Sequence, residues 1–192
     1  AERYAVRSVN SKVSTLNALL ESMGCRKFRV TKQLPAEAFD TPELTRQEYV
    51  RMLQTAKILE DERAYVLTKL FATTGIAVLD LPAVTVEAVQ TGHTVLKSGK
   101  KLEIIRFPAS LQADLLRYAR ENGHPSGMIF TKKDGSAIAR TQVSLFIQKL
   151  ALEAKIPAEK GNIRALRQLY KTTISGIEAN FDLLVRQAYE RQ

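Results

Sequence analysis

Three cationic side chains on one helical stretch could bind a phosphate. Arg164, Arg167 and Lys171 are spaced i, i+3 and i+7, which puts them near one another along a helix surface. Apolar side chains of the same stretch, among them Leu166 and Leu169, fall on another face. We expect the basic face to contact phosphate, because guanidinium groups donate paired hydrogen bonds to phosphate oxygens. A basic face that only meets solvent is the alternative.

A second group of cations crowds one turn between two β-like stretches. Lys97, Lys100 and Lys101 lie within "LKSGKK", and the whole chain of 192 residues carries a net charge of +9. Lysines at a hairpin tip suit the DNA backbone, which attracts positive charge without demanding exact geometry. A charged sheet edge that blocks strand pairing is the structural alternative. The charge balance favours a polyanionic partner, and we expect double-stranded DNA.

Nucleophilic, metal and nucleotide chemistry find little support in the sequence. Cys25 is the single cysteine and would need a histidine partner to act as a nucleophile, but nothing marks His93 or His124 as that partner. Two histidines and one cysteine are too few for an ordinary zinc site. A glycine-rich phosphate loop is also missing from the sequence. We therefore expect no metal and no cofactor.

The patterning divides the chain into three parts. Residues 1–23 carry an apolar stripe at helical spacing, residues 24–43 hold two prolines and no period, and residues 44–192 form one compact domain. Because a lone amphipathic helix needs other helices to cover it, we expect residues 1–23 to end a preceding domain. No apolar run is long enough to span a bilayer, and no signal peptide is visible. Together with the lone cysteine, this predicts a cytoplasmic, nucleoid-associated protein.

The compact domain is predicted to run from helices to a small sheet and back to helices. Thr45 and Glu48 match a capping box at the start of a first helix, and Gly75 ends a second helix over 61–74. Residues 84–107 contain three short β-branched stretches separated by turn residues, which predict three antiparallel strands. Further helices are expected over 109–121, from Thr141 to Pro157, over 162–177 and over 179–190. The predicted fold class is α+β and mostly helical.

Three stretches, in order, resemble the tyrosine recombinases and phage integrases. "LTRQEYVRML" resembles the opening helix of their catalytic domain. "TTGIAVLDLPAVTVEAV" resembles their first signature, a Thr-Gly turn with an arginine and an acid before the first strand. "NIRALRQLY" resembles their second signature, His-x-x-Arg-His, and "VNSKVSTLNALLESMG" resembles the last helix of their core-binding domain. The resemblance implies a tyrosine-recombinase-like catalytic domain at 44–192.

The resemblance also implies a chemistry. The family breaks a DNA phosphodiester by attack of a tyrosine, and two arginines clamp the charge that develops on the phosphate oxygens. The first clamp arginine falls on Ala77, which cannot fill that role, whereas the acid that supports it falls on Asp80. The lysine that moves protons to the leaving oxygen falls on Lys97, with Lys100 as the alternative.

The second signature is only partly kept. Its histidine falls on Arg164, its arginine on Arg167, its second histidine on Gln168 and its aromatic residue on Tyr170. The nucleophile is the weakest match, because Tyr189 follows Arg167 more closely than the family's tyrosine follows its arginine. The body therefore resembles an integrase, while the active site lacks a clamp arginine, a histidine and a well-placed tyrosine.

Three functions remain open at this point. The chain could be a DNA-binding recombinase or integrase whose missing parts lie elsewhere in a longer protein, and the family then implies a tetrameric assembly on DNA. It could be a non-catalytic relative that binds DNA as an accessory or regulatory factor. It could also be an unrelated basic helical module that binds RNA or protein.

Overall fold

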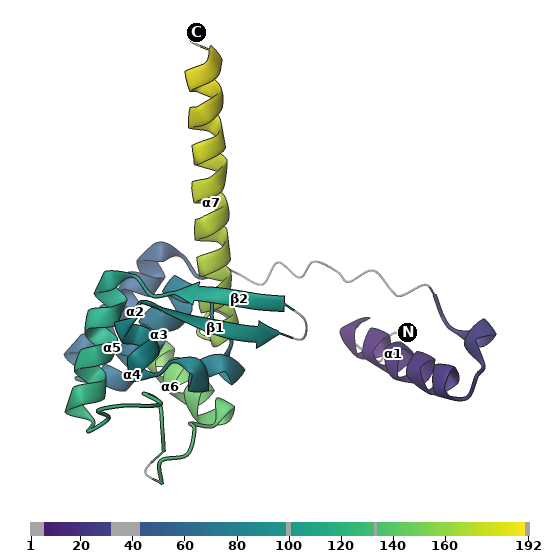
Figure 1. Cartoon of the computed structure of the whole chain (residues 1–192), viewed down its shortest axis with the longest axis horizontal. Helices are drawn as coiled ribbons and strands as arrows, with labels where there is room; N and C mark the ends of the chain where they lie inside the picture. Colours follow the sequence, from purple (N-terminus) through teal and green to yellow (C-terminus); the bar gives the residue numbers. More distant parts are fainter. Residues whose placement is uncertain (1–5, 32–42, 99–100, 133, 191–192) are drawn as a thin grey trace. The chain divides into compact units, whose positions relative to one another are not determined.

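The computed structural model describes residues 6–31, 43–98, 101–132 and 134–190, and the chain divides into two compact units, 1–40 and 41–192 (Figure 1). The first unit contains the helix α1 (Val6–Ser22) and the 3-10 turn η1 (Arg26–Phe28). The Asn17 side chain donates to the carbonyl of Val30 and accepts from its N–H, both at 2.9 Å. These two bonds tie the chain that leaves η1 back to the middle of α1. The assignment of residues 1–23 to a preceding domain stays a prediction.

The second unit is built around one buried helix. This helix, α3 (Glu62–Thr74), packs against α2 (Arg46–Ile58), α5 (Ala109–Glu121), α6 (Arg140–Glu153) and the first turns of α7 (Ile163–Glu190) (Figure 1). Side chains on every side of α3 are buried, including Val66, Leu67, Leu70 and Phe71. A helix with buried side chains on all its faces belongs in the centre of a core, and here four helices cover it.

The predicted helix ends around α2 and α3 are confirmed. Thr45 caps α2 in a reciprocal capping box with Glu48, and the Glu48 carboxylate also pairs with Lys160 at 3.0 Å. Asp61 caps α3 by accepting from the N–H of Ala64 at 2.9 Å. Gly75 ends α3 in the left-handed conformation, at φ 65°. These caps satisfy backbone groups that a helix leaves unpaired at its ends.

Tyr49 lies on α2 and is partly buried against the core, which makes the stability of the fold depend on pH above 10. Burial first, then the neighbouring Tyr65 and the charge of Asp114, raise the pKa of Tyr49 from 10.0 to about 12. The folded state therefore binds this proton more tightly than the unfolded state does. The stabilisation is complete below pH 10 and is lost as the pH rises toward 12.

We expect the Tyr49→Phe variant to lose less stability than the wild type between pH 10 and 12. Between pH 8 and 11.5 the difference should be about 2 kcal/mol, because one pKa unit corresponds to about 1.4 kcal/mol and the shift is only partly expressed below pH 12. Urea titrations at pH 8, 10 and 11.5, followed by circular dichroism, measure it. Identical pH profiles for the two proteins would contradict the assignment of the effect to Tyr49.

The sheet has two strands, not the three that the sequence predicted. Strands β1 (His93–Ser98) and β2 (Lys101–Arg106) form one antiparallel hairpin, in which Thr94, Leu96 and Ile105 face the core. The expected first strand is instead the short helix α4 (Val86–Gln90), which follows the 3-10 helix η2 (Val78–Ala83). Thr85 caps α4 by accepting from the N–H of Ala88, and valines three apart, Val86 and Val89, are both buried. The cap and this spacing favour one helical turn over a strand.

The last two predicted helices are one helix, α7. Its first turns are anchored in the core by Ile163 and Leu166, and every described residue after Tyr170 is exposed. Gly176 keeps the helical conformation, so a glycine alone does not interrupt the helix. Within the described ranges, neither α7 nor any other helix is long and apolar enough to cross a membrane.

Candidate phosphate-binding site

The turn after α3 brings the two signature stretches into contact. The Arg167 Nε atom donates to the carbonyl oxygen of Gly75 at 2.8 Å. The Tyr170 ring lies directly against Gly75, where a Cβ atom would come within 2.4 Å of ring carbon Cδ1. One glycine therefore positions both side chains, through its carbonyl and through its missing side chain. The hydrogen bond also leaves the terminal nitrogens of Arg167 available for a ligand.

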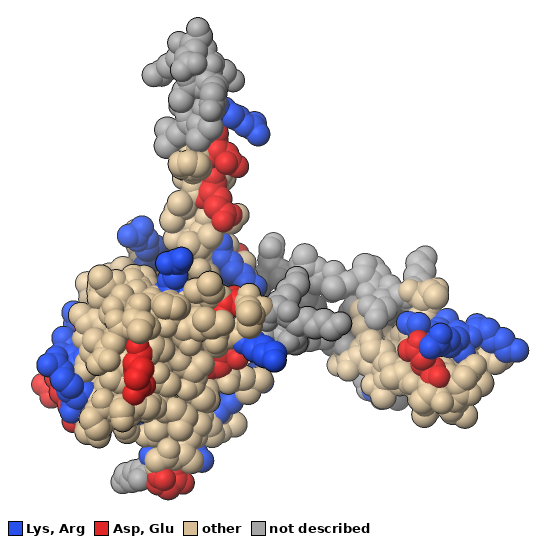
Figure 2. Space-filling model, viewed as in Figure 1, with Lys and Arg blue, Asp and Glu red and all other residues tan. Residues whose placement is uncertain are grey.

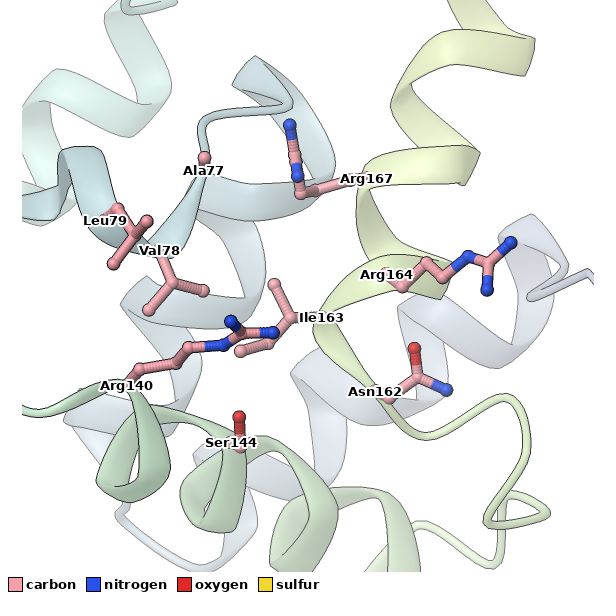
Figure 3. A pocket seen from close by; sticks show the side chains of 9 residues that line it. All are labelled: Ala77, Val78, Leu79, Arg140, Ser144, Asn162, Ile163, Arg164 and Arg167. Atoms are coloured by element: carbon pink, nitrogen blue, oxygen red, sulfur yellow. The ribbon is translucent and has the colours of Figure 1, made fainter. Parts of the chain in front are cut away.

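A cavity of about 390 Å³ opens between this turn and the starts of α6 and α7. One wall is the backbone after Gly75, and the other walls come from the first turns of the two helices. Figure 3 shows the guanidinium group of Arg140 reaching across the cavity and that of Arg167 turned toward the Ala77 loop, while Arg164 points away. The lining residues are Ala77, Val78, Leu79, Arg140, Ser144, Asn162, Ile163, Arg164 and Arg167.

The electrostatics of the cavity favour an anion. Three of its described lining residues are arginines and none is an acid. No carboxylate in the described part of the chain forms an ion pair with Arg140, Arg164 or Arg167. Cations without a protein counter-charge raise the local potential and attract polyanions. Figure 2 shows further basic side chains near the base of α7, where it leaves the body of the domain.

Two helix starts add to this positive potential. Arg140 is the first residue of α6, and Asn162 and Ile163 stand at the start of α7. The Asn162 side chain accepts from the N–H of Ala165 at 2.9 Å and so caps α7. Helix dipoles place partial positive charge at their N-termini, which helps to hold an anion beside the arginines.

The structure brings some of the predicted site residues together and leaves others apart. Ala77, Arg164 and Arg167 line the cavity, as the matched signatures predict for neighbouring positions. Asp80 lies in η2 outside the lining, and among the described residues its carboxylate has no hydrogen-bond or ion-pair partner. Lys171 is exposed further along α7 and does not line the cavity.

Of the hairpin lysines, Lys97 has a side chain in the described part of the structure, and it stands apart from the lining. Lys97 is exposed on β1, opposite Leu102 in the register, and does not line the cavity. Lys100 lies outside the described residues. The backbone of Lys101 is described in β2 and that of Tyr189 in the last turn of α7, but their side chains are outside the described part.

Sequence reasoning missed two residues of the site, Arg140 and Ser144. Both lie on α6 one turn apart, so they project from the same face. In the sequence, the apolar spacing of the same stretch predicts its buried face, and Val143, Ile147, Leu150 and Ala151 are indeed buried. The sequence also predicted Thr141 as the cap, whereas the cap position is Ala139, two residues earlier, and α6 begins at Arg140. A search for polar residues spaced i, i+4 opposite the apolar face could have found Arg140 and Ser144.

The arrangement can hold an oxyanion, but its lining offers little for covalent chemistry. Among the described lining residues, Ser144 is the only hydroxyl, and no histidine, carboxylate or tyrosine accompanies it. A serine needs an adjacent base to become a nucleophile. Within the described residues, no three histidine, cysteine or acidic side chains gather as metal ligands. The geometry therefore supports binding by guanidinium groups.

No protein-family model and no curated protein matches the sequence of the chain. Solved structures do match. The crystal structure of XerA recombinase aligns over 90% of this chain and 63% of its own, with a TM-score of 0.60 and 18% identity. The Tn1549 transposon integrase, solved in complex with transposon right end DNA, aligns over 92% of this chain and 69% of its own, with a TM-score of 0.69 and 12% identity.

The XerH site-specific recombinase, bound to its difH substrate in a pre-cleavage complex, aligns over 95% of this chain. Its TM-score is 0.69 and its identity 14%, and the alignment covers 58% of that recombinase. The chain thus spans less than two thirds of the XerA and XerH structures. These likenesses confirm the fold that the signatures predicted. The chain has the mostly helical fold, with a small antiparallel sheet, of the tyrosine recombinase catalytic domain.

Proposed function

We propose that this protein binds double-stranded DNA in the manner of a site-specific recombinase or integrase, and that residues 1–192 bind without cleaving. The observation that carries the proposal is the arginine-lined cavity, which has no acidic lining residue and lies where the two signature stretches meet. The solved structures with this fold include complexes with DNA, which supports the same partner for this chain. A phosphate of the DNA backbone would occupy the cavity beside Arg167.

The hairpin extends the proposed contact surface beyond the cavity. Lys97 is exposed on β1, and the lysines of the following turn belong to the same basic stretch of sequence. Lysine contacts the DNA backbone as a point charge, so these residues would add affinity without reading the base sequence. Self-association on DNA is part of the same proposal, because the family resemblance implies a multimeric assembly.

We expect the chain to bind a duplex DNA probe with an affinity that falls steeply as salt is raised. Each phosphate contact releases condensed counterions, which gives a slope of about −0.9 in log K against log salt for each contact. The total slope of log K against log salt is the sum over all contacts. Replacing Lys97, Lys100, Arg164 and Arg167 by alanine should therefore reduce the magnitude of the total slope by about three to four. Fluorescence anisotropy between 50 and 200 mM salt measures both effects.

A charge-matched control separates a defined site from the general charge of the protein. The control replaces four exposed cations that do not line the cavity, Arg51, Arg120, Lys132 and Lys149, by alanine. Melting temperatures show whether each variant folds. If the fourfold variant with Arg167→Ala does not fold, Arg167→Lys is used in its place. Equal loss in the two fourfold variants, or a flat salt response, would contradict the proposal. Tighter binding to double-stranded RNA than to DNA would favour the unrelated RNA-binding module.

A non-catalytic role as a DNA-binding accessory factor is the second candidate. It is favoured by the small Ala77 side chain in the cavity wall, where the family resemblance places a clamp arginine. The two candidates differ in whether a longer form of the protein cleaves DNA after Ala77→Arg. Cleavage by that variant would favour a disabled recombinase, and its absence would favour the accessory factor.

A further inference from the structure

We propose that Arg140 supplies the second guanidinium group to the bound phosphate, in place of the arginine that Ala77 does not provide. This inference rests on the proposed function, since it names how the same cavity holds a DNA phosphate. Arg140 and Ala77 line the same cavity, from α6 and from the turn after α3. The place left open by the short side chain of Ala77 is thus within the cavity that Arg140 enters.

The direction of the side chains supports Arg140 over Arg164 as the partner of Arg167. In Figure 3 the Arg140 side chain extends toward Ile163, another residue that lines the cavity, whereas Arg164 points away from the other lining side chains. Arg167 is fixed by its hydrogen bond to Gly75, so its free nitrogens have a defined direction. Arg140 has no partner among the described residues that would hold it back from a ligand.

The chemistry of a phosphodiester fits this pair of arginines. The group has two non-bridging oxygens, and each can accept hydrogen bonds from one guanidinium group. Ser144, one turn after Arg140, adds a hydroxyl donor on the same wall. Lysine at position 140 would keep the charge but lose the planar pair of donors, so it should bind less well than arginine.

The decisive experiment moves the guanidinium group from one wall of the cavity to the other. Duplex DNA binding is measured by anisotropy for the wild type, Arg140→Ala, Arg140→Lys and the double variant Arg140→Ala with Ala77→Arg. Arg120→Ala on α5 is the control, because it removes one exposed arginine that does not line the cavity. Circular dichroism melts verify that each variant folds.

We expect Arg140→Ala to weaken DNA binding roughly ten- to a hundredfold more than Arg120→Ala, the range for a hydrogen bond to a charged group. Arg140→Lys should fall between Arg140→Ala and the wild type. Ala77→Arg should recover most of the lost affinity in the Arg140→Ala background. If Arg167→Ala weakens salt-dependent binding but Arg140→Ala does no more than Arg120→Ala, the inference is overturned while the proposed function stands.

If the wild type does not bind DNA, the proposed function is rejected. A second probe then tests whether the two-arginine site still binds phosphate. Inorganic phosphate is then titrated at constant ionic strength, with chloride as the balancing anion. A rise in the melting temperature of the wild type that Arg140→Ala and Arg167→Ala each abolish would retain the two-arginine site for a different phosphate ligand. An equal rise in the wild type and in Arg140→Ala would overturn the inference.

Discussion

Replacing Gly75 by alanine should lower the free energy of unfolding by about 2 to 5 kcal/mol. Two effects add at this position. Gly75 has φ 65°, and a residue with a Cβ atom pays about 1 to 2 kcal/mol in the left-handed region. The new Cβ would also lie 2.4 and 2.9 Å from two carbons of the Tyr170 ring, which must move. Displacing a packed ring typically costs a further 1 to 3 kcal/mol, by the rough scale for overpacked cores.

Gly123 is a matched control for the Gly75 prediction. It has φ 72°, and a Cβ atom there would meet nothing within 4 Å. Gly123→Ala should therefore show the backbone effect alone, about 1 to 2 kcal/mol. Urea unfolding of the two variants measures the difference. Equal destabilisation would show that the Tyr170 ring yields without cost, against the prediction.

The Gly75 variant also tests how the site is held. The carbonyl of Gly75 accepts the bond that directs Arg167, so a shift of this turn should weaken DNA binding as well as stability. A double-mutant cycle with Tyr170→Leu separates the two effects, because a smaller side chain relieves the contact with the new Cβ atom. Stability should recover in part in the double variant if the ring contact is the cause.

Local features of the fold followed from the sequence because they depend on neighbouring residues. The capping box of Thr45 and Glu48 and the glycine stop at Gly75 need no knowledge of distant contacts. The missing strand shows the limit of this reasoning. Val86 and Val89 fit both a short strand and a helical turn. The cap provided by Thr85 stabilises the helical turn. Likewise, helices over 162–177 and 179–190 were predicted as separate, whereas α7 continues through both ranges.

The candidate site was partly predictable for a different reason. The second signature put Arg164 and Arg167 on one helix, and its pairing with the first signature placed them near Ala77, as the cavity shows. Arg140 could not be found in this way. It reaches the cavity because the start of α6 lies beside the start of α7, and this depends on how two helices pack against α3. A sequence pattern predicts which face of each helix is apolar. It does not predict where two helices lie relative to each other.

The largest expected effect concerns chemistry: residues 1–192 should form no covalent adduct with DNA. A suicide substrate, a nicked duplex that traps the protein–DNA intermediate, followed by a denaturing gel, is the measurement. Removing one charge-stabilising donor alone typically costs roughly a hundred- to a thousandfold in rate. Here the resemblance places Ala77 at a clamp arginine and Arg164 at a histidine, and neither can perform the matched role.

The tyrosines near the site should not replace the missing nucleophile. The Tyr170 ring is packed against Gly75, which holds it in the wall of the domain and away from an attacking role. Tyr189 lies in the last turn of α7, in a helix that leaves the core well before that residue. An adduct that disappears in the Tyr189→Phe variant would refute the prediction and identify Tyr189 as the nucleophile.

The variant Ala77→Arg gives the strictest form of this test. It returns a guanidinium group to the cavity, so it should strengthen phosphate binding, but it supplies neither a base nor a nucleophile. We therefore expect tighter DNA binding and still no adduct. An adduct that forms only with Ala77→Arg would show that residues 1–192 contain every other group needed for cleavage. The alanine at position 77 would then be the single cause of inactivity. Tighter binding without an adduct would mean that holding the phosphate and cutting the DNA are separable in this fold.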